Sequence, residues 1–247
     1  MSDAGIWSDL AQWVGPTVNE TPGGMVADPW GLILHIEQGT NTGSIAWCKN
    51  PASKVSAHFF APKTGTMKQL VSVLDKAWAE VDGNPEWISL ECEGKSGDSL
   101  TPDQILSAAQ LLARIHLVYG APLSVSDDPY HVKGLTGHGL GGAGYGGHYD
   151  CPGAPILAQR TEIIHQAAII VAEQTEGPVS LTAGDITAIK LAVWGYENPK
   201  LDQHDMRQTI VNAETNSAHA VTIAGGVSAQ VTAVAADLAA IKSKLGI

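Results

Sequence analysis

The sequence predicts an α/β fold, in which a mixed central β-sheet is flanked by helices and followed by a helical C-terminal tail. Two short segments have strand character: GLILHI at residues 31–36 and WISLEC at residues 87–92. A long amphipathic helical pattern follows at residues 101–119, and a second one follows at about residues 154–173. Strands that precede and alternate with helices in this order favour one sheet covered by helices.

The predicted strands place particular side chains on particular faces. In WISLEC, period-two alternation puts Trp87, Ser89 and Glu91 on one face, so Glu91 and the following Glu93 point the same way. Residues 55–61 and 67–71 are separated by the turn PKTGT, which predicts a β-hairpin. The short pieces PLSVS and GLTG are expected to be extended.

The helix at residues 101–119 has clear signals at both ends. Thr101 is placed as the N-cap, Pro102 occupies the first helical position, and Gln104 completes a capping box. Gly120 is placed to end the helix.

The chain is expected to divide into four parts. Residues 1–23 predict an N-terminal lead-in, residues 24–174 the catalytic domain, residues 175–201 a linker with a short helix, and residues 202–247 a helical region. From Ile210 small and apolar residues recur with the spacing of a coiled-coil seam, most strongly over 227–245. This helix would either self-associate or pack back on its own domain, and light scattering distinguishes the two.

Composition limits the partners. The 247 residues carry a formal net charge of -11, which argues against nucleic-acid binding because that function needs a basic face. The sequence has no apolar run long enough for a transmembrane helix and no basic-then-apolar leader, so we expect no membrane insertion and synthesis in a cytosol. An odd number of cysteines, 3, favours reduced thiols.

The loop GLTGHGLGGAGYGGHYDCPG, residues 134–153, contains residue types that hold zinc. The candidate ligands along the chain are His35, His58, His138, His148, Asp150 and Cys151. The glycines would let ligands distant in the loop converge. Each feature also has a structural interpretation, since a histidine on a strand is often a satisfied polar group and a glycine-rich loop is often only flexible.

Five segments in order resemble the zinc-dependent N-acetylmuramoyl-L-alanine amidases, a family that also contains peptidoglycan recognition proteins. They are LHIEQGT, KVSAHFFAPKTGTMKQLV, AWAEVDGNPEWISLECEG, LTGH and DCPG, and the resemblance covers about residues 24–173. Endolysins of phages that infect actinobacteria are the members that the sequence most resembles.

The resemblance implies a set of site residues. It assigns His35, His138 and Cys151 as ligands of Zn²⁺ and Glu91 as the catalytic glutamate. His148 also competes with His138 for the role of second ligand, and His138 is favoured. Two positions depart from the family pattern: Ala57 stands where many members have a tyrosine, and Tyr149 stands where many have lysine or threonine.

The implied function is hydrolysis of the amide between N-acetylmuramic acid and L-alanine in peptidoglycan. Glu91 would pass a proton from the attacking water to the leaving amine, and His148 or Tyr149 would stabilise the oxyanion. The alternative is a non-catalytic peptidoglycan-binding module of the same fold, but Cys151 and Glu91 favour an enzyme. As an endolysin, the protein would stay in the host bacterial cytoplasm until lysis and then act on the cell wall.

Overall fold

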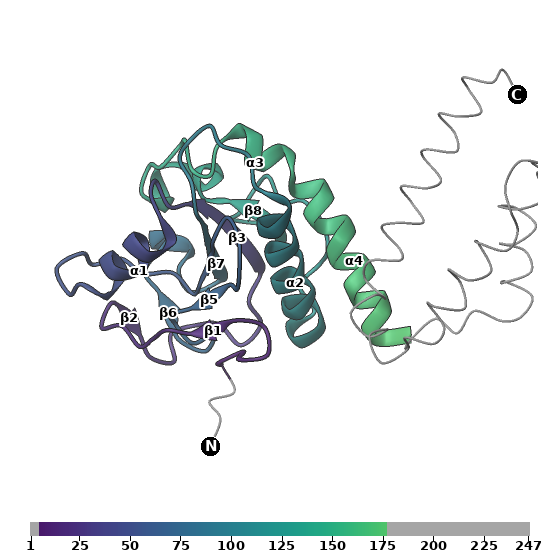
Figure 1. Cartoon of the computed structure of the whole chain (residues 1–247), viewed down its shortest axis with the longest axis horizontal. Helices are drawn as coiled ribbons and strands as arrows, with labels where there is room; N and C mark the ends of the chain where they lie inside the picture. Colours follow the sequence, from purple (N-terminus) through teal and green to yellow (C-terminus); the bar gives the residue numbers. More distant parts are fainter. Residues whose placement is uncertain (1–4, 177–247) are drawn as a thin grey trace, which may run out of the picture. The chain divides into compact units, whose positions relative to one another are not determined.

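A computed structural model describes residues 5–176 of the chain (Figure 1). The chain divides into two units, Met1–Ala172 and Glu173–Ile247. Most of the predicted linker and the whole of the predicted coiled-coil region, residues 202–247, lie outside the described residues. Within the described part, no helix is both long enough and apolar enough to cross a membrane.

A six-stranded mixed sheet forms the centre of the first unit, which confirms the predicted fold class. Its strand order is β1 (Gln12–Trp13), β5 (Lys68–Gln69), β4 (Phe59–Ala61), β7 (Trp87–Cys92), β3 (Gly31–Ile36) and β8 (Gly134–Gly137). β4 and β5 are antiparallel, which confirms the predicted hairpin, and the other neighbours are parallel. A separate antiparallel pair is formed by β2 (Glu20–Thr21) and β6 (Lys76–Ala77).

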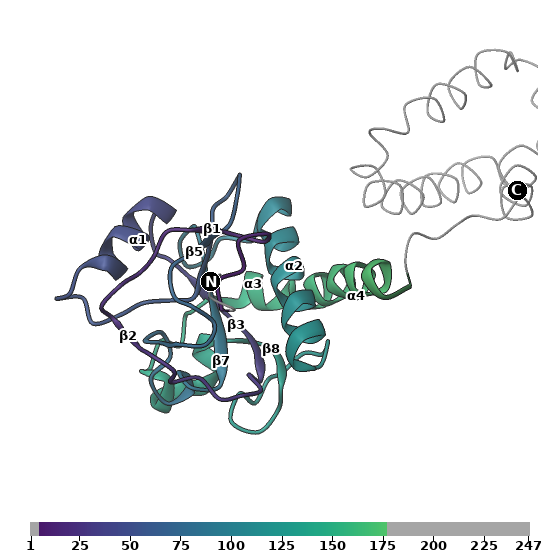
Figure 2. The same ribbon diagram turned by 90° about the horizontal axis from the view of Figure 1, so that it is seen from below.

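The main core lies between the sheet and α2 (Pro102–Tyr119). α2 covers one face of the sheet and α1 (Asn41–Lys49) lies on the other side, as two views at right angles show (Figures 1 and 2). Alternate residues of β3 and β7 face α2, namely Leu32, Leu34, Ile36, Ile88, Leu90 and Cys92. The intervening residues, including His35 and Glu91, therefore lie on the opposite face.

The ends of α2 agree with the sequence prediction. The Thr101 side chain accepts a hydrogen bond from the Gln104 N–H, and the Gln104 side chain accepts one from the Thr101 N–H, so the capping box is complete. Gly120 ends the helix in the left-handed conformation, with φ of 70°.

The second predicted helix is two helices, α3 (Ala154–Ala158) and α4 (Arg160–Glu176). The break falls at Gln159, whose side chain accepts a hydrogen bond from the Leu100 N–H and donates one to the Leu100 carbonyl. This contact with a distant segment stabilises the break between α3 and α4. It could not be read from the helical periodicity.

Two segments are more ordered than the sequence predicts. Residues 1–23 read as a lead-in, but this segment contains β1, and the side chains of Trp7 and Ala11 are buried in the main core. The segment 39–51 reads as turns, but it forms α1, with Thr40 as an N-cap that accepts a hydrogen bond from the Gly43 N–H. The N-cap threonine and the following Pro51 were the signals for this helix.

Candidate metal and catalytic site

Strand register places a histidine beside a glutamate at the end of the sheet. β3 and β7 are parallel, and His35 pairs with Glu91. The two side chains share the face that α2 does not cover, and His35 Nδ1 lies 3.9 Å from Glu91 Oε1. His35 is buried, whereas the Glu91 side chain is 22% exposed. Glu91 is thus the member of the pair that a substrate can reach.

The glycine loop returns to this strand end. β8 leads directly into a 3-10 helix, η2 (His138–Tyr145), so His138 follows the strand next to β3. The Gly139 N–H donates to the Cys151 carbonyl at 2.5 Å, which closes the loop. A Cβ at Gly139 would lie 2.6 to 2.9 Å from three carbonyl oxygens of the loop, so this closure requires glycine.

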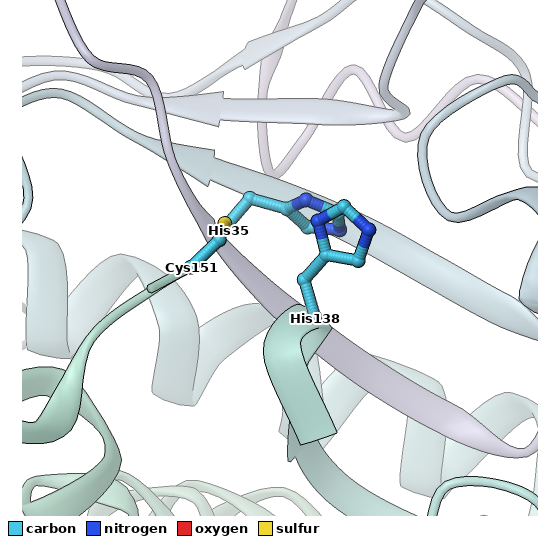
Figure 3. Close-up of side chains that lie close together, drawn as sticks. All are labelled: His35, His138 and Cys151. Atoms are coloured by element: carbon cyan, nitrogen blue, oxygen red, sulfur yellow. The ribbon is translucent and has the colours of Figure 1, made fainter. Parts of the chain in front are cut away.

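His35, His138 and Cys151 converge, with one potential ligand atom from each lying within 4.8 Å of the others (Figure 3). The His35 and His138 ring centroids are 4.4 Å apart. Among residues 5–176, this is the group of histidine, cysteine and carboxylate side chains that could hold a metal ion.

The structure separates the two histidines of the loop. His138 is buried, and its Nε2 lies 2.7 Å from the Tyr145 carbonyl oxygen. His148 is exposed, and its ring centroid lies 5.0 Å from that of His138, outside the cluster. Tyr149 is 69% exposed. His138 therefore lies with the candidate ligands, while His148 and Tyr149 stand at the rim.

The cluster has the donor set and the environment of a zinc site. Two imidazoles and one thiol match a catalytic zinc site, which keeps a fourth position for water or substrate. Burial, the largest cause, lowers the pKa of His138 to about 4 and raises that of Cys151 to about 12. The Ile36 N–H donates to Cys151 Sγ at 3.4 Å, a contact that favours the thiolate that metals bind. The residues present thus fit Zn²⁺.

Carboxyl groups are concentrated around the cluster. Burial, together with the nearby Glu37, raises the pKa of Glu91 to about 8. Burial also raises the pKa of Glu37 to about 7. These groups are costly to ionise in the protein alone, and a bound cation would offset that cost.

Sequence reasoning missed one residue of the site. Glu80 is fully buried, and its Oε2 lies 3.5 Å from His35 Nε2, on the side of the ring away from Nδ1. Burial raises its pKa well above the usual range, and Glu91 adds to the shift. Glu80 lies in the ordered segment AWAEVDGNPEWISLECEG, but it stands in a loop far from His35 in the chain, and no spacing in the sequence pairs the two side chains.

His58, another histidine that the sequence suggested as a ligand, is buried immediately before β4 and lies outside the cluster. Its Nδ1 lies 3.0 Å from Ser89 Oγ, and its Nε2 lies 3.0 Å from the Asp75 carbonyl oxygen. Both ring nitrogens have partners, so the satisfied core histidine is the correct interpretation. Asp150 is exposed and outside the cluster.

A groove of about 1240 Å³ opens over the cluster. His35, His138, Cys151 and Glu91 all line it. The groove walls also include Trp47, Lys63, Glu93, Ser96, His148 and Tyr149. Trp47 is 57% exposed and presents its ring at the wall of the groove. An extended polar molecule can therefore reach the cluster from the surface.

Comparison with known proteins gives one family. The model of a family described as N-acetylmuramoyl-L-alanine amidase matches residues 25–154, which contain the whole cluster and Glu91. N-acetylmuramoyl-L-alanine amidase A from Achromobacter lyticus is 35% identical over 69 residues, which is 28% of this chain. The match spans only 39% of that relative's length.

Solved structures of similar proteins cover about two thirds of the chain at low identity. The AmpD crystal structure is 21% identical with a TM-score of 0.47, covering 66% of this chain and 98% of its own. Staphylococcus aureus hydrolase AmiA, solved with its ligand, is 16% identical with a TM-score of 0.49, covering 68% of this chain and 88% of its own.

Proposed function

Because the chain belongs to the N-acetylmuramoyl-L-alanine amidase family over residues 25–154, we propose that it is a zinc-dependent peptidoglycan hydrolase. The bond cleaved is the amide that joins the lactyl group of N-acetylmuramic acid to L-alanine. The observation that carries this proposal is the convergence of His35, His138 and Cys151 beside Glu91 in an open groove.

The proposed chemistry divides between the metal and the protein. Bound zinc would act as a Lewis acid that lowers the pKa of water towards ~7 and polarises the substrate carbonyl. His35, His138 and Cys151 would hold it. Glu91 takes the proton of the attacking water at a carboxylate oxygen and passes it to the nitrogen of the leaving L-alanine.

Two residues at the rim have proposed roles in the same step. His148 lies beside His138 on the groove wall, and Tyr149 follows it. Either side chain can donate a hydrogen bond to the oxygen that becomes negative as the carbonyl is attacked. The groove would bind the glycan and the stem peptide on either side of this point.

Mass spectrometry of digested peptidoglycan tests the reaction. We expect new L-alanine amino termini and no new reducing sugars, with activity lost in Cys151→Ser and on treatment with a chelator. New reducing ends would show a glycosidase instead. Binding to the wall without any new termini would support the alternative, a non-catalytic binding module.

The proposed biological setting is a phage endolysin in host lysis, supported by the resemblance of its ordered motifs to endolysins of phages that infect actinobacteria. The protein would accumulate in the host bacterial cytoplasm and reach the cell wall at lysis. Fractionation of infected cells before and during lysis tests this, and early accumulation at the wall would contradict it. Self-association through residues 202–247 stays a proposal, and a monomer in light scattering would contradict it.

A further inference from the structure

Unpartnered polar atoms face one another behind His35. Among residues 5–176, His35 Nε2 and both carboxyl oxygens of Glu80 are buried without a hydrogen-bond partner. His35 Nε2 and Glu80 Oε2 are 3.5 Å apart. Buried polar atoms are almost always hydrogen-bonded, so three unpartnered atoms in one place need a reason.

The loop that carries Glu80 is built to hold it there. Asn84 Oδ1 accepts hydrogen bonds from the N–H groups of Ala79 and Glu80, at 2.9 and 2.7 Å. The next residue, Val81, has φ of 51°, a conformation that is costly for a β-branched side chain. The loop then packs through Gly83 against the ring of Tyr145, where any Cβ would collide with the ring.

The geometry also identifies which nitrogen of each imidazole is free for a metal. His138 Nε2 lies 2.7 Å from the Tyr145 carbonyl oxygen, so Nε2 carries the proton and Nδ1 has the free lone pair. In His35, Nδ1 lies on the side of Glu91, 3.9 Å from its Oε1, while Nε2 lies on the side of Glu80. Glu80 does not line the groove, whereas Glu91 does. Glu80 is therefore placed to act on His35 and not on a substrate.

We propose that Glu80 is a positioning residue for the metal site: it accepts a hydrogen bond from the Nε2–H of His35 and thereby keeps the lone pair on Nδ1, directed at the metal. A carboxylate behind a ligand histidine fixes its tautomer and ring orientation and increases its basicity. The pair would then resemble the contact between His138 and the Tyr145 carbonyl, with a stronger acceptor. This inference rests on the zinc site of the proposed function.

Zinc affinity, measured on the full chain by competition with a chelating indicator, tests the role. We expect Glu80→Met to weaken zinc binding by about 10- to 100-fold and Glu80→Gln to weaken it less, because glutamine keeps an acceptor oxygen. The free energy of unfolding of the chelator-treated protein should be unchanged or higher in both variants, because each removes a buried unpartnered carboxyl group. In the zinc-loaded wild type, the Nε2–H proton of His35 should give a downfield NMR signal that Glu80→Met shifts upfield.

Glu20→Gln is the matched control. Glu20 also has a buried oxygen without a partner and a pKa raised by burial, but it lies on β2 and does not line the groove. It should leave zinc affinity unchanged.

The outcomes distinguish this inference from the proposal on which it rests. If the wild type binds zinc and the Glu80 variants bind it equally tightly, the positioning role is wrong and the zinc site stands. If the Glu80 variants lose zinc affinity and also have a lower free energy of unfolding without metal, Glu80 has only a structural role. A wild type that binds no zinc would overturn the zinc site and this inference together.

Discussion

The two faces of the same pair of strands, β3 and β7, differ most at the end that carries the candidate site. On the face covered by α2, residues such as Leu34 and Leu90 are fully buried in a continuous apolar core. The opposite face, with the loops beside it, holds most of the buried polar atoms that lack partners in the described chain. They belong to His35, Glu37, Glu80, Glu91 and Thr136.

The difference shows how a small sheet divides its roles. Alternation sends every second side chain to each face, so one strand can contribute to stability and to chemistry at once. Groups arranged for chemistry are usually costly to the fold, and the well-packed face provides the stability that tolerates them. Substitutions on the two faces should therefore separate stability from activity.

The largest expected effect is a loss of activity on substitution of Glu91, which lies on the face opposite α2. Glu91→Gln should reduce amide hydrolysis by about 10²- to 10⁴-fold, because it removes the proton acceptor while keeping the shape of the side chain. Zinc content and the free energy of unfolding should not fall, since one oxygen of Glu91 has no partner to lose. Turnover of a soluble muropeptide, followed by chromatography, measures the rate. A variant as active as the wild type would rule out Glu91 as the proton carrier.

The next largest effect is a loss of stability on substitution of Leu90, which lies on the face that α2 covers. Leu90→Ala, one residue away, should lower the free energy of unfolding by about 2–5 kcal/mol, because it leaves a cavity in the main core. The rate per folded molecule should change little. Denaturant titration gives the stability change, and Leu106→Ala, at a side chain 46% exposed on α2, is the control with the same chemistry. Equal losses in the two variants would contradict the assignment of Leu90 to the core.

A smaller effect is expected on the pH dependence of stability, and it comes from His58. This side chain packs against Ser89, on the face opposite α2, and both of its ring nitrogens have hydrogen-bond partners. Burial lowers its pKa from 6.5 to about 4 in the folded protein. Between these pH values the unfolded chain binds a proton that the folded protein does not, so stability falls as pH falls. The titration of His58 should lower the free energy of unfolding by up to about 3 kcal/mol as the pH falls to about 4. Above the pKa of 6.5 in the unfolded chain, it should have no effect.

Comparing the wild type with His58→Gln in chelator isolates this contribution. The slope of unfolding free energy against pH should be shallower in the variant between pH 6.5 and 4, whatever its absolute stability. Parallel slopes in the two proteins would mean that His58 titrates normally in the folded state.

Sequence patterns within a short segment predicted those strands and helices whose bounds depend mainly on neighbouring residues. The bounds of β3 and β7, the capping of α2 and the position of β8 all follow from alternation, cap residues and glycine. The break at Gln159 and the packing of Trp7 depend on contacts with distant segments, which periodicity cannot show.

The same distinction holds at the site. His35, His138, Cys151 and Glu91 stood out because they lie in ordered motifs at strand ends, and the structure brings all four to one place. Glu80 lies in one of the same ordered segments, but it stands in a loop rather than at a strand end, and the resemblance implies no role for it. Its contact with His35 is made from a loop that contains the positive-φ residue Val81 and that packs through Gly83 against Tyr145, and no sequence pattern encodes this packing.

The central strand of the site precedes both of its neighbours in the chain. β3 pairs with β7 and β8, which are both made later, and the contact between Ile36 and Cys151 spans 115 positions. Contacts this distant in the chain require a long loop to close before any of them is gained, and pairings of this kind slow folding. A nascent or partly unfolded chain therefore cannot assemble the three candidate ligands, so zinc capture would report completed folding, and metal would slow unfolding more than it speeds folding.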